Sequence, residues 1–198
     1  MAGRRLDWLD GLHGHGRLLE LGPATGEFVA SAELAGWDVA GLETSAWAAE
    51  QATQVTDGVQ RGDLSSWRKQ HPDETVDAVA MFHVLEHVAD PESLLSEIAA
   101  VLRPGGVLVL EVPNGDSPGA KPDGRTWWVA SLDDHFHHHT APGLGQLLKR
   151  TGFRDVVTTL LPLQIYAPVV WRARAHDAVR RRAVRPVRDL LRLSAHRS

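Results

Sequence analysis

The stretch from Arg17 to Gly26, RLLELGPATG, constrains the fold of this chain more than any other. An apolar run that contains Glu20 leads into a loop of small residues, and Glu27 opens a helix-like segment. A strand, a glycine turn and a helix leave unpaired backbone N–H groups at the edge of a sheet, where a ligand can reach them. Glycine suits such a turn because a Cβ would keep the ligand away from the backbone. One such turn is weak evidence, so the rest of the chain decides its meaning.

Strand-like and helix-like segments alternate along the following residues with short connections between them. Strands are expected at residues 17–21, 37–43, 58–63, 76–82 and 107–112, and helices at 27–35, 45–54, 91–102 and 141–151. Two further apolar stretches, 156–161 and 165–171, predict a closing antiparallel pair. Such alternation is typical of a parallel sheet with helices on both faces. We therefore expect an α/β protein with a single Rossmann-like domain, whose seven-stranded sheet is mostly parallel with an antiparallel C-terminal strand.

The domain is expected to span residues 1–171, with a basic, helical tail at 172–198. Within the domain, an amphipathic helix in residues 1–16 would cover one end, and residues 115–140, where periodicity lapses, would form a substrate-side loop. The net charge of −4 hides an imbalance, because nine arginines against two acids give residues 171–198 about +7. Such a tail could contact a membrane surface, a nucleic acid or an acidic partner. We favour a solvated helix packed on its own acidic domain, and nucleic acid is the less expected partner.

Composition excludes several classes of protein. No apolar run approaches the roughly 18 residues that a membrane span needs. Residues 1–16 contain two arginines but lack the apolar core of a secretory signal. Cysteine is absent, which rules out disulfides and thiolate metal sites and fits a cytoplasmic protein.

Polar residues follow four of the predicted strands, at Glu20, Glu43, Asp63 and the segment His83–His87. Glu43 stands where a carboxylate can accept hydrogen bonds from ribose hydroxyls. Asp63 offers an acceptor for an exocyclic amine such as that of adenine. No GxxxxGK[ST] motif occurs, and Glu20 would repel a pyrophosphate but suits a cationic group. A ribose, an adenine and a cation together describe S-adenosylmethionine.

These motifs resemble those of class I S-adenosylmethionine-dependent methyltransferases, in the branch that includes ubiquinone-biosynthesis-type O-methyltransferases. The segments that carry the resemblance are LLELGPATGEF, VAGLETS, GDL and VDAVAMFHVLEHVADPESLLSEIAAVLRPGGVLVLEVPN. The resemblance implies S-adenosyl-L-methionine as the cofactor, bound by Glu20, Gly22, Ala24, Gly26, Glu43, Asp63, Leu64 and His83. Two positions of these segments depart from the family pattern. Ala24 replaces the middle glycine of the first motif. His83 stands where metal-binding relatives have an acid, although Glu86 and His87 match their pattern, so we assign no metal.

Histidines supply the candidate bases. Methyl transfer is an in-line displacement at a sulfonium, and an oxygen or nitrogen nucleophile often needs a base near neutral pH. We predict His87 or His138 as the catalytic residue, although His87 could equally make a local hydrogen bond where a helix begins. His135 falls on the substrate side of the same histidine-rich segment, for which metal binding is the alternative interpretation.

Trp127 and Trp128 could form an aromatic wall for a planar or sugar-like substrate, or could pin their loop to the domain. The sequence thus predicts a cytoplasmic methyltransferase, monomeric or homodimeric, that methylates a small molecule on oxygen, with secondary metabolism as one setting. Two alternatives remain. One is an RNA or protein methyltransferase that uses the basic tail, and the other is a cofactor-binding scaffold without catalysis.

Overall fold

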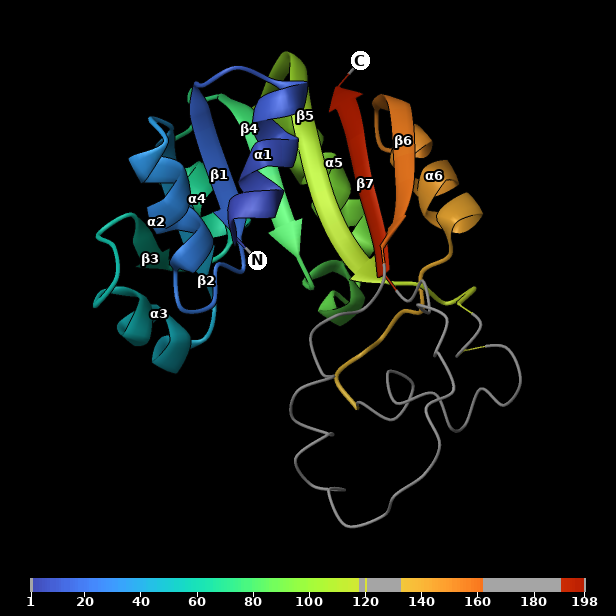
Figure 1. The fold of residues 1–198 in the computed structure, drawn as a ribbon, viewed down its shortest axis with the longest axis horizontal. Coiled ribbons are helices and arrows are strands. Elements are labelled where there is room, and N and C mark those ends of the chain that lie inside the picture. The colour runs from blue at the N-terminus through green and yellow to red at the C-terminus, as the bar shows by residue number, and fades with distance from the viewer. Residues whose placement is uncertain (1, 118–119, 121–132, 162–189, 198) are drawn as a thin grey trace, which may run out of the picture.

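The computed structural model describes residues 2–117, 120, 133–161 and 190–197, which form one seven-stranded sheet between two layers of helices (Figure 1). The strands are β1 (Arg17–Leu21), β2 (Asp38–Glu43), β3 (Val59–Arg61), β4 (Val76–Phe82), β5 (Leu102–Pro113), β6 (Phe153–Leu161) and β7 (Leu190–Arg197). The helices are α1 (Ala2–Leu12), α2 (Glu27–Leu34), α3 (Ala46–Ala52), α4 (Leu64–Gln70), α5 (Pro91–Val101) and α6 (Ala141–Arg150), with a 3-10 turn, η1, at Leu85–His87.

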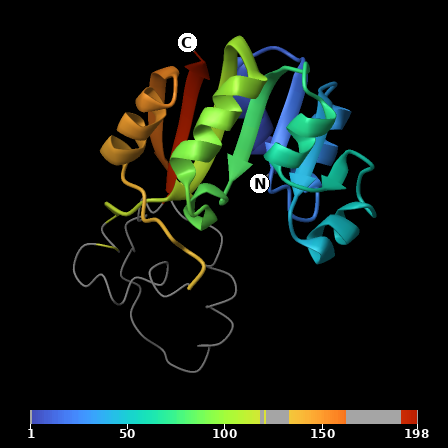
Figure 2. The same cartoon turned by 180° about the vertical axis from the view of Figure 1, so that it is seen from behind.

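The strand order is β3-β2-β1-β4-β5-β7-β6. Strand β7 runs antiparallel to β5 and β6, and the other pairs are parallel. The predicted α/β architecture, with a mostly parallel sheet and an antiparallel C-terminal strand, is therefore confirmed. Helices α1, α2 and α3 cover one face of the sheet, and α4, α5 and α6 cover the other. The second face is turned toward the viewer in Figure 2. All seven residues of β4 are buried, as expected for a central strand covered on both faces.

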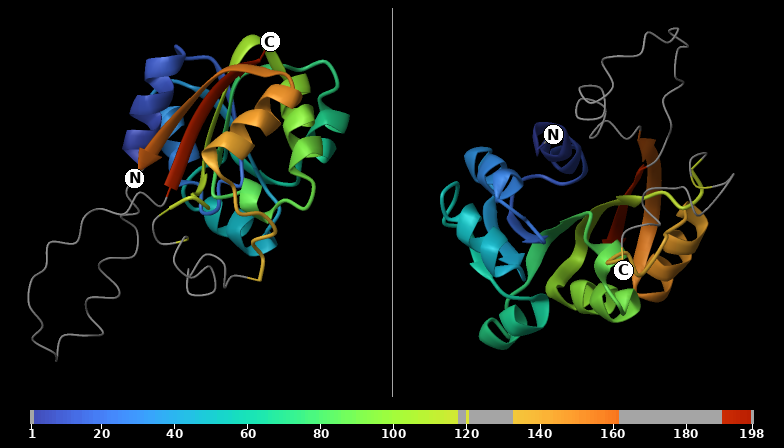
Figure 3. Two further views of the ribbon diagram at one scale, coloured as in Figure 1. Left: turned by 90° about the vertical axis from the view of Figure 1, so that its right-hand side faces the viewer. Right: turned by 90° about the horizontal axis from the view of Figure 1, so that it is seen from below.

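Side-chain caps fix where the helices near the carboxyl edge begin. Ser45 accepts a hydrogen bond from the Ala48 N–H at 3.3 Å at the start of α3, and Asp63 accepts one from the Ser66 N–H at 2.7 Å at the start of α4. Helix α4 was not predicted, because Leu64 and Trp67 are its only apolar residues and do not by themselves show a helical period. The carboxyl ends of β1 to β5 gather along one edge of the sheet, the edge that faces the viewer in the right-hand view of Figure 3.

The C-terminal part of the chain differs from the prediction. Residues 190–197, expected in a helical tail, form β7 between β5 and β6 and so belong to the sheet. The partner of the 153–161 strand is therefore β7, whereas the predicted partner, 165–171, lies outside the described residues. The helical spacing was misleading because the apolar residues Leu191, Leu193 and Ala195 also follow a two-residue period, and all three are buried.

A buried cluster of charges joins the N-terminal helix to β5 and β7. Glu111 accepts hydrogen bonds from Arg5 Nε and Arg192 Nε, each at 2.8 Å. The Arg5 guanidinium also lies 4.0 Å from the centre of the Phe82 ring, and that of Arg192 lies 4.5 Å from the Trp8 ring. Burial raises the pKa of Glu111, but the two arginines outweigh it and hold the pKa below its ordinary value. Arg192, which belongs to the predicted basic tail, is therefore largely buried and bonded to Glu111 inside the domain.

Candidate active site

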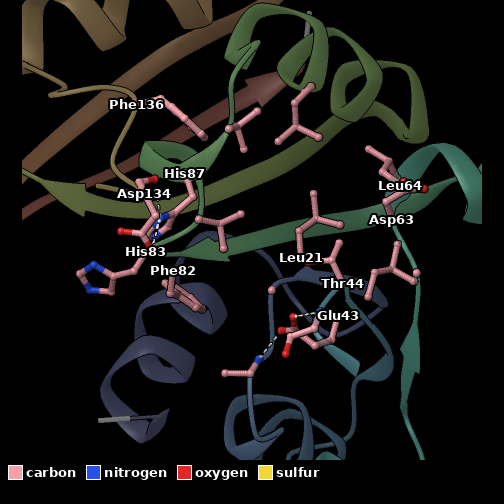
Figure 4. A pocket seen from close by; sticks show the side chains of 18 residues that line it. Leu21, Glu43, Thr44, Asp63, Leu64, Phe82, His83, His87, Asp134 and Phe136 are labelled. Carbon is pink, nitrogen blue, oxygen red and sulfur yellow. Dashed lines mark hydrogen bonds and ion pairs between the residues drawn. The ribbon is translucent and has the colours of Figure 1, made fainter. Parts of the chain in front are cut away.

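A cavity of about 850 Å³ opens at the carboxyl ends of β1 to β4 (Figure 4), a volume usual for cofactor and small-molecule sites. The loops after these four strands form most of its wall. Seven of the residues predicted for the site line it: Gly22, Ala24, Glu43, Asp63, Leu64, His83 and His87. The structure therefore gathers residues from four separate loops around one space, as the strand-end pattern predicted.

The first loop has the backbone of a glycine turn although its middle residue is alanine. Gly22, Ala24 and Gly26 all have positive φ, of 70°, 50° and 86°. A Cβ on Gly22 would lie 2.5 Å from a methyl group of Val84, so this position needs glycine. Ala24 holds the left-handed conformation at a cost of roughly 1–2 kcal/mol. Gly26 precedes α2 and does not line the cavity.

Glu43 ties the first loop to the start of α3. Its side chain is buried, and its two oxygens accept hydrogen bonds from the Ala24 N–H at 3.0 Å and the Ser45 N–H at 2.8 Å, which Figure 4 marks as dashed lines. Each carboxylate oxygen has a second lone-pair site. The carboxylate can therefore accept further bonds from ligand hydroxyls while it keeps the loop in place.

Asp63 stands at the far end of the cavity beside Leu64 (Figure 4). Hydrogen bonds from Ser66 lower the pKa of this exposed carboxyl group. Its capping role fixes the side chain at the start of α4. Leu64 is 3% exposed, so the acid and an apolar surface adjoin here, a combination that suits a flat heterocycle with an exocyclic amine.

Glu20 does not line the cavity. Its side chain is buried on β1, and burial raises its pKa to about 8, although Arg5 lowers it in part and Glu27 and Glu43 raise it further. The acid predicted to face a cationic ligand therefore lies behind the first loop. With this raised pKa the carboxyl group is mostly protonated at neutral pH, so it neither lines the cavity nor places a negative charge beside it.

The segment after β4 forms the opposite wall. His83 has a φ of 60°, its N–H donates to the Glu111 carbonyl at 2.9 Å, and its Nδ1 lies 3.4 Å from Oε1 of Glu86. His87 lines the cavity, and its Nδ1 lies 3.0 Å from the Asp134 carbonyl oxygen. His87 therefore borders the cavity, as one interpretation required, whereas its side chain meets a residue 47 positions away rather than a local group, as the other supposed.

The histidine-rich segment before α6 packs against this wall. The His135 ring lies 4.6 Å from that of His87, nearly perpendicular to it, and burial and His87 lower the pKa of His135. Burial also lowers the pKa of His139, whose Nε2 lies 3.5 Å from the Leu85 carbonyl oxygen. His138 is exposed and does not line the cavity. Of the two predicted bases, only His87 borders the pocket.

Several lining residues were not predicted for the site, and two of them come from the segment before α6. Asp134 and the 61% exposed Phe136 border the cavity beside His87 (Figure 4). No local pattern identifies them, although their place beside the predicted histidines was a signal that could have been used. Trp127 and Trp128 lie outside the described residues.

A model of the methyltransferase domain family matches residues 4–158. The chain belongs to this family. It is 37% identical over 119 residues to an uncharacterized 37.1 kDa protein in transposon TN4556 of Streptomyces fradiae, covering 57% of this chain and 34% of that protein. It is 37% identical over 91 residues to a probable S-adenosylmethionine-dependent methyltransferase of Mycolicibacterium smegmatis, covering 45% of this chain and 32% of that protein. The matched part of the chain therefore spans about a third of the length of these two relatives.

Among solved structures, a SAM-dependent methyltransferase from Archaeoglobus fulgidus superposes with a TM-score of 0.75 at 17% identity, covering 99% of this chain and 92% of that one. This likeness shows the shared fold. The family match over residues 4–158, with the relative from Mycolicibacterium smegmatis, identifies this part of the chain as an S-adenosylmethionine-dependent methyltransferase domain, with S-adenosylmethionine as its cofactor. Within the described residues, no helix of this methyltransferase domain is long and apolar enough to cross a membrane.

Proposed function

We propose that this domain transfers the methyl group of S-adenosylmethionine to an oxygen atom of a small molecule. The observation that carries the proposal is the two-sided cavity. The loops after β1, β2 and β3 form one side, and His87, Asp134 and Phe136 form the other. A volume of about 850 Å³ suits a cofactor with a small acceptor beside it. The HVLEHV, LRPGG and EVPN segments support placement in the branch of ubiquinone-biosynthesis-type O-methyltransferases.

On the cofactor side, each loop has a distinct task. The backbone N–H groups between Gly22 and Gly26 bind the methionine end, Glu43 accepts from the ribose hydroxyls, and Asp63 accepts from the adenine amine. These contacts orient the sulfonium so that its methyl group points toward the opposite wall, where positioning supplies most of the rate enhancement.

On the acceptor side, His87 is the base. The Asp134 carbonyl can only accept a hydrogen bond, so Nδ1 of His87 carries the proton and Nε2 keeps a free lone pair. Nε2 takes the proton of the acceptor hydroxyl as the oxygen attacks the methyl carbon. The carbon–sulfur bond breaks, and its electron pair stays on the sulfur of neutral S-adenosylhomocysteine. Phe136 offers an apolar surface for the rest of the acceptor.

The RNA or protein methyltransferase is the weaker alternative, because Arg192 pairs with Glu111 and Arg197 donates to the Leu102 carbonyl inside the fold. These two arginines of the predicted basic tail are therefore engaged within the domain. The cofactor-binding scaffold without catalysis would show itself by S-adenosylmethionine binding without turnover on any acceptor.

An acceptor screen with methyl-labelled S-adenosylmethionine tests the proposal, beginning with phenols and other hydroxylated small molecules. On any acceptor that is methylated, His87→Ala should lower kcat by about 10²-fold or more. The matched variant His138→Ala should retain activity near wild type, because His138 is exposed and does not border the cavity. Methylation of RNA or protein alone, or equal activity of His87→Ala and wild type, would contradict the proposal.

A further inference from the structure

We propose that the methyl acceptor is a hydroxylated aromatic compound with a protonated amine, and that Asp134 and Phe136 select the amine. The proposal rests on the proposed function, because it names the class of acceptor for the same site. It is based on the acceptor side of the cavity, where a carboxylate and an aromatic ring adjoin the base His87. Figure 4 shows these three side chains on one side of the cavity, away from Asp63 and Leu64.

The charge of the cavity wall favours a cationic acceptor. Three carboxylates line the cavity, those of Glu43, Asp63 and Asp134, and no lysine or arginine of the described residues does. Glu43 and Asp63 already accept hydrogen bonds from backbone N–H groups on the cofactor side. Asp134 is therefore the acid left for the acceptor. A carboxylate or phosphate on the acceptor would meet no opposite charge among these residues, whereas an ammonium group would pair with Asp134.

Asp134 has the accessibility and the lone pairs that such a contact needs. Its side chain is 73% exposed, and its Oδ2 lies 3.4 Å from Nδ1 of His87, beyond the usual length of a hydrogen bond. The carbonyl oxygen of Asp134, at 3.0 Å, accepts from that nitrogen instead. The backbone of Asp134 thus orients the base, and the carboxylate keeps its acceptor sites for a ligand.

Phe136 places an aromatic face next to this carboxylate. The residue lies two positions after Asp134 and is 61% exposed, although it borders the cavity. A phenyl ring can stack on an aromatic acceptor and can attract an ammonium group to its face. The partly buried side chains of Val88 and Leu94 also line the cavity, so the rest of the acceptor would meet apolar surface.

The base and the acid are close enough to contact one small molecule. Nε2 of His87, which takes the hydroxyl proton, belongs to the ring whose Nδ1 lies 3.4 Å from the Asp134 carboxylate. A hydroxyl at Nε2 and an ammonium group at Asp134 can therefore both belong to one aromatic ring with a short aminoalkyl arm.

This arrangement also directs methyl transfer to oxygen rather than nitrogen. A carboxylate beside the amine stabilises its protonated form and raises the pKa of the amine. An ammonium nitrogen has no lone pair and cannot attack the methyl carbon. The hydroxyl loses its proton to His87 during the attack, so the oxygen is the nucleophile and the amine keeps its proton.

Three phenols of similar size test the proposal: 3-hydroxybenzylamine, 3-ethylphenol and 3-hydroxybenzoate, whose substituents are cationic, neutral and anionic. For wild type, kcat/KM with 3-hydroxybenzylamine should exceed that with 3-ethylphenol by about fivefold or more, and 3-hydroxybenzoate should be the poorest acceptor. Asp134→Asn should lower the ratio of the first two values about three- to fivefold, whatever it changes equally for both through His87. Phe136→Leu should lower the ratio about twofold or more.

Asp133→Asn is the matched control. It removes the same charge from a neighbouring exposed acid that does not line the cavity, so the ratio should stay at the wild-type value. An equal fall of the ratio in Asp133→Asn and Asp134→Asn would overturn the proposal. An unchanged ratio in Asp134→Asn would do so as well, because Asp134 would then act only through His87.

Calorimetry of the same phenols in the presence of saturating S-adenosylhomocysteine separates this proposal from the proposed function. Tighter binding of 3-hydroxybenzylamine, with methyl transfer to its nitrogen or to no phenol, would overturn oxygen methylation and leave the ammonium site standing. Methylation of all three phenols on oxygen at equal kcat/KM would overturn the ammonium site alone. Equal affinity for the three phenols, or no binding of any, would also overturn the ammonium site.

Discussion

Glu43 and Glu86 are buried carboxylates at the same edge of the sheet, yet their surroundings are opposite. Both oxygens of Glu43 accept hydrogen bonds from backbone N–H groups, of Ala24 and Ser45. Neither oxygen of Glu86 has a hydrogen-bond partner among the described residues. The cofactor side thus holds its acid with two backbone hydrogen bonds, whereas the acid on the β4 side has none and only the His83 ring nearby, at 3.4 Å. Stability and ligand binding should therefore respond differently on the two sides.

The largest expected effect is on the pH dependence of stability and comes from Glu20. This residue is a buried acid on the cofactor side that lacks the backbone hydrogen bonds of Glu43. Burial raises its pKa to about 8 from an ordinary 4.5. The proton held in the folded state stabilises the fold fully below about pH 4.5, and this stabilisation is lost as pH rises to about 8. The free energy of unfolding of wild type should therefore fall by several kcal/mol relative to Glu20→Gln between these limits, at about 1.4 kcal/mol per pH unit at most.

Urea unfolding of wild type and Glu20→Gln at about pH 5 and about pH 8 measures this difference. The other titrating groups are the same in both proteins, so their contributions to the pH dependence cancel in the difference between the two. An equal change in the free energy of unfolding with pH in both proteins would mean that the pKa of Glu20 is not raised in the folded state. A cation near Glu20 would then have to compensate its buried charge.

Glu43→Ala and Glu86→Met should change stability in opposite directions. Removal of Glu43 leaves two backbone donors without an acceptor and should lower the free energy of unfolding by about 1–3 kcal/mol. Replacement of Glu86 by an apolar side chain of similar length removes an uncompensated carboxylate. It should raise the free energy of unfolding of metal-free protein by about 1–3 kcal/mol.

Both variants are compared with wild type by urea unfolding in the presence of a chelator. Destabilisation by both substitutions would mean that Glu86 has partners in the folded protein, and the contrast between the two sides would be lost.

The smallest expected effect concerns the first loop. Ala24 has a φ of 50°, which costs an alanine but not a glycine. Ala24→Gly should therefore raise the free energy of unfolding by up to about 1 kcal/mol and leave cofactor affinity unchanged or stronger. Gly22→Ala is the matched contrast and should destabilise, because its Cβ would meet Val84. Thermal unfolding of wild type and the two variants measures both effects. A lower melting temperature for Ala24→Gly than for wild type would show that the loop is not strained.

The sequence predicted the cofactor side better than the rest of the molecule, for physical reasons. Strands β1 and β4 have the predicted bounds, because their apolar runs end at sharp turn signals. Gly22, Glu43 and Asp63 were found because each lies at or just after the end of a strand, and parallel strands bring their carboxyl ends to one edge. Strand β7 was missed because its apolar residues also fit a helical period.

Contacts between distant segments were beyond a local pattern. Asp134 meets His87 across 47 residues, and the approach of His135 to Glu86 depends on how the segment before α6 folds back over η1. The metal alternative for the histidine run was considered from the sequence, but adjacency along the chain does not show convergence in space. The packing of the segment against η1 supplies that information.

The central claim is that the loops after β1, β2 and β3 bind S-adenosylmethionine, and calorimetric titration tests it most directly. Wild type should bind S-adenosylmethionine in the micromolar range, and Glu43→Ala should bind at least about tenfold more weakly through the loss of a charged acceptor. Glu50→Ala, which removes an exposed acid from α3, should bind as wild type does. No binding by folded wild type, or equal affinity in wild type and Glu43→Ala, would contradict the account.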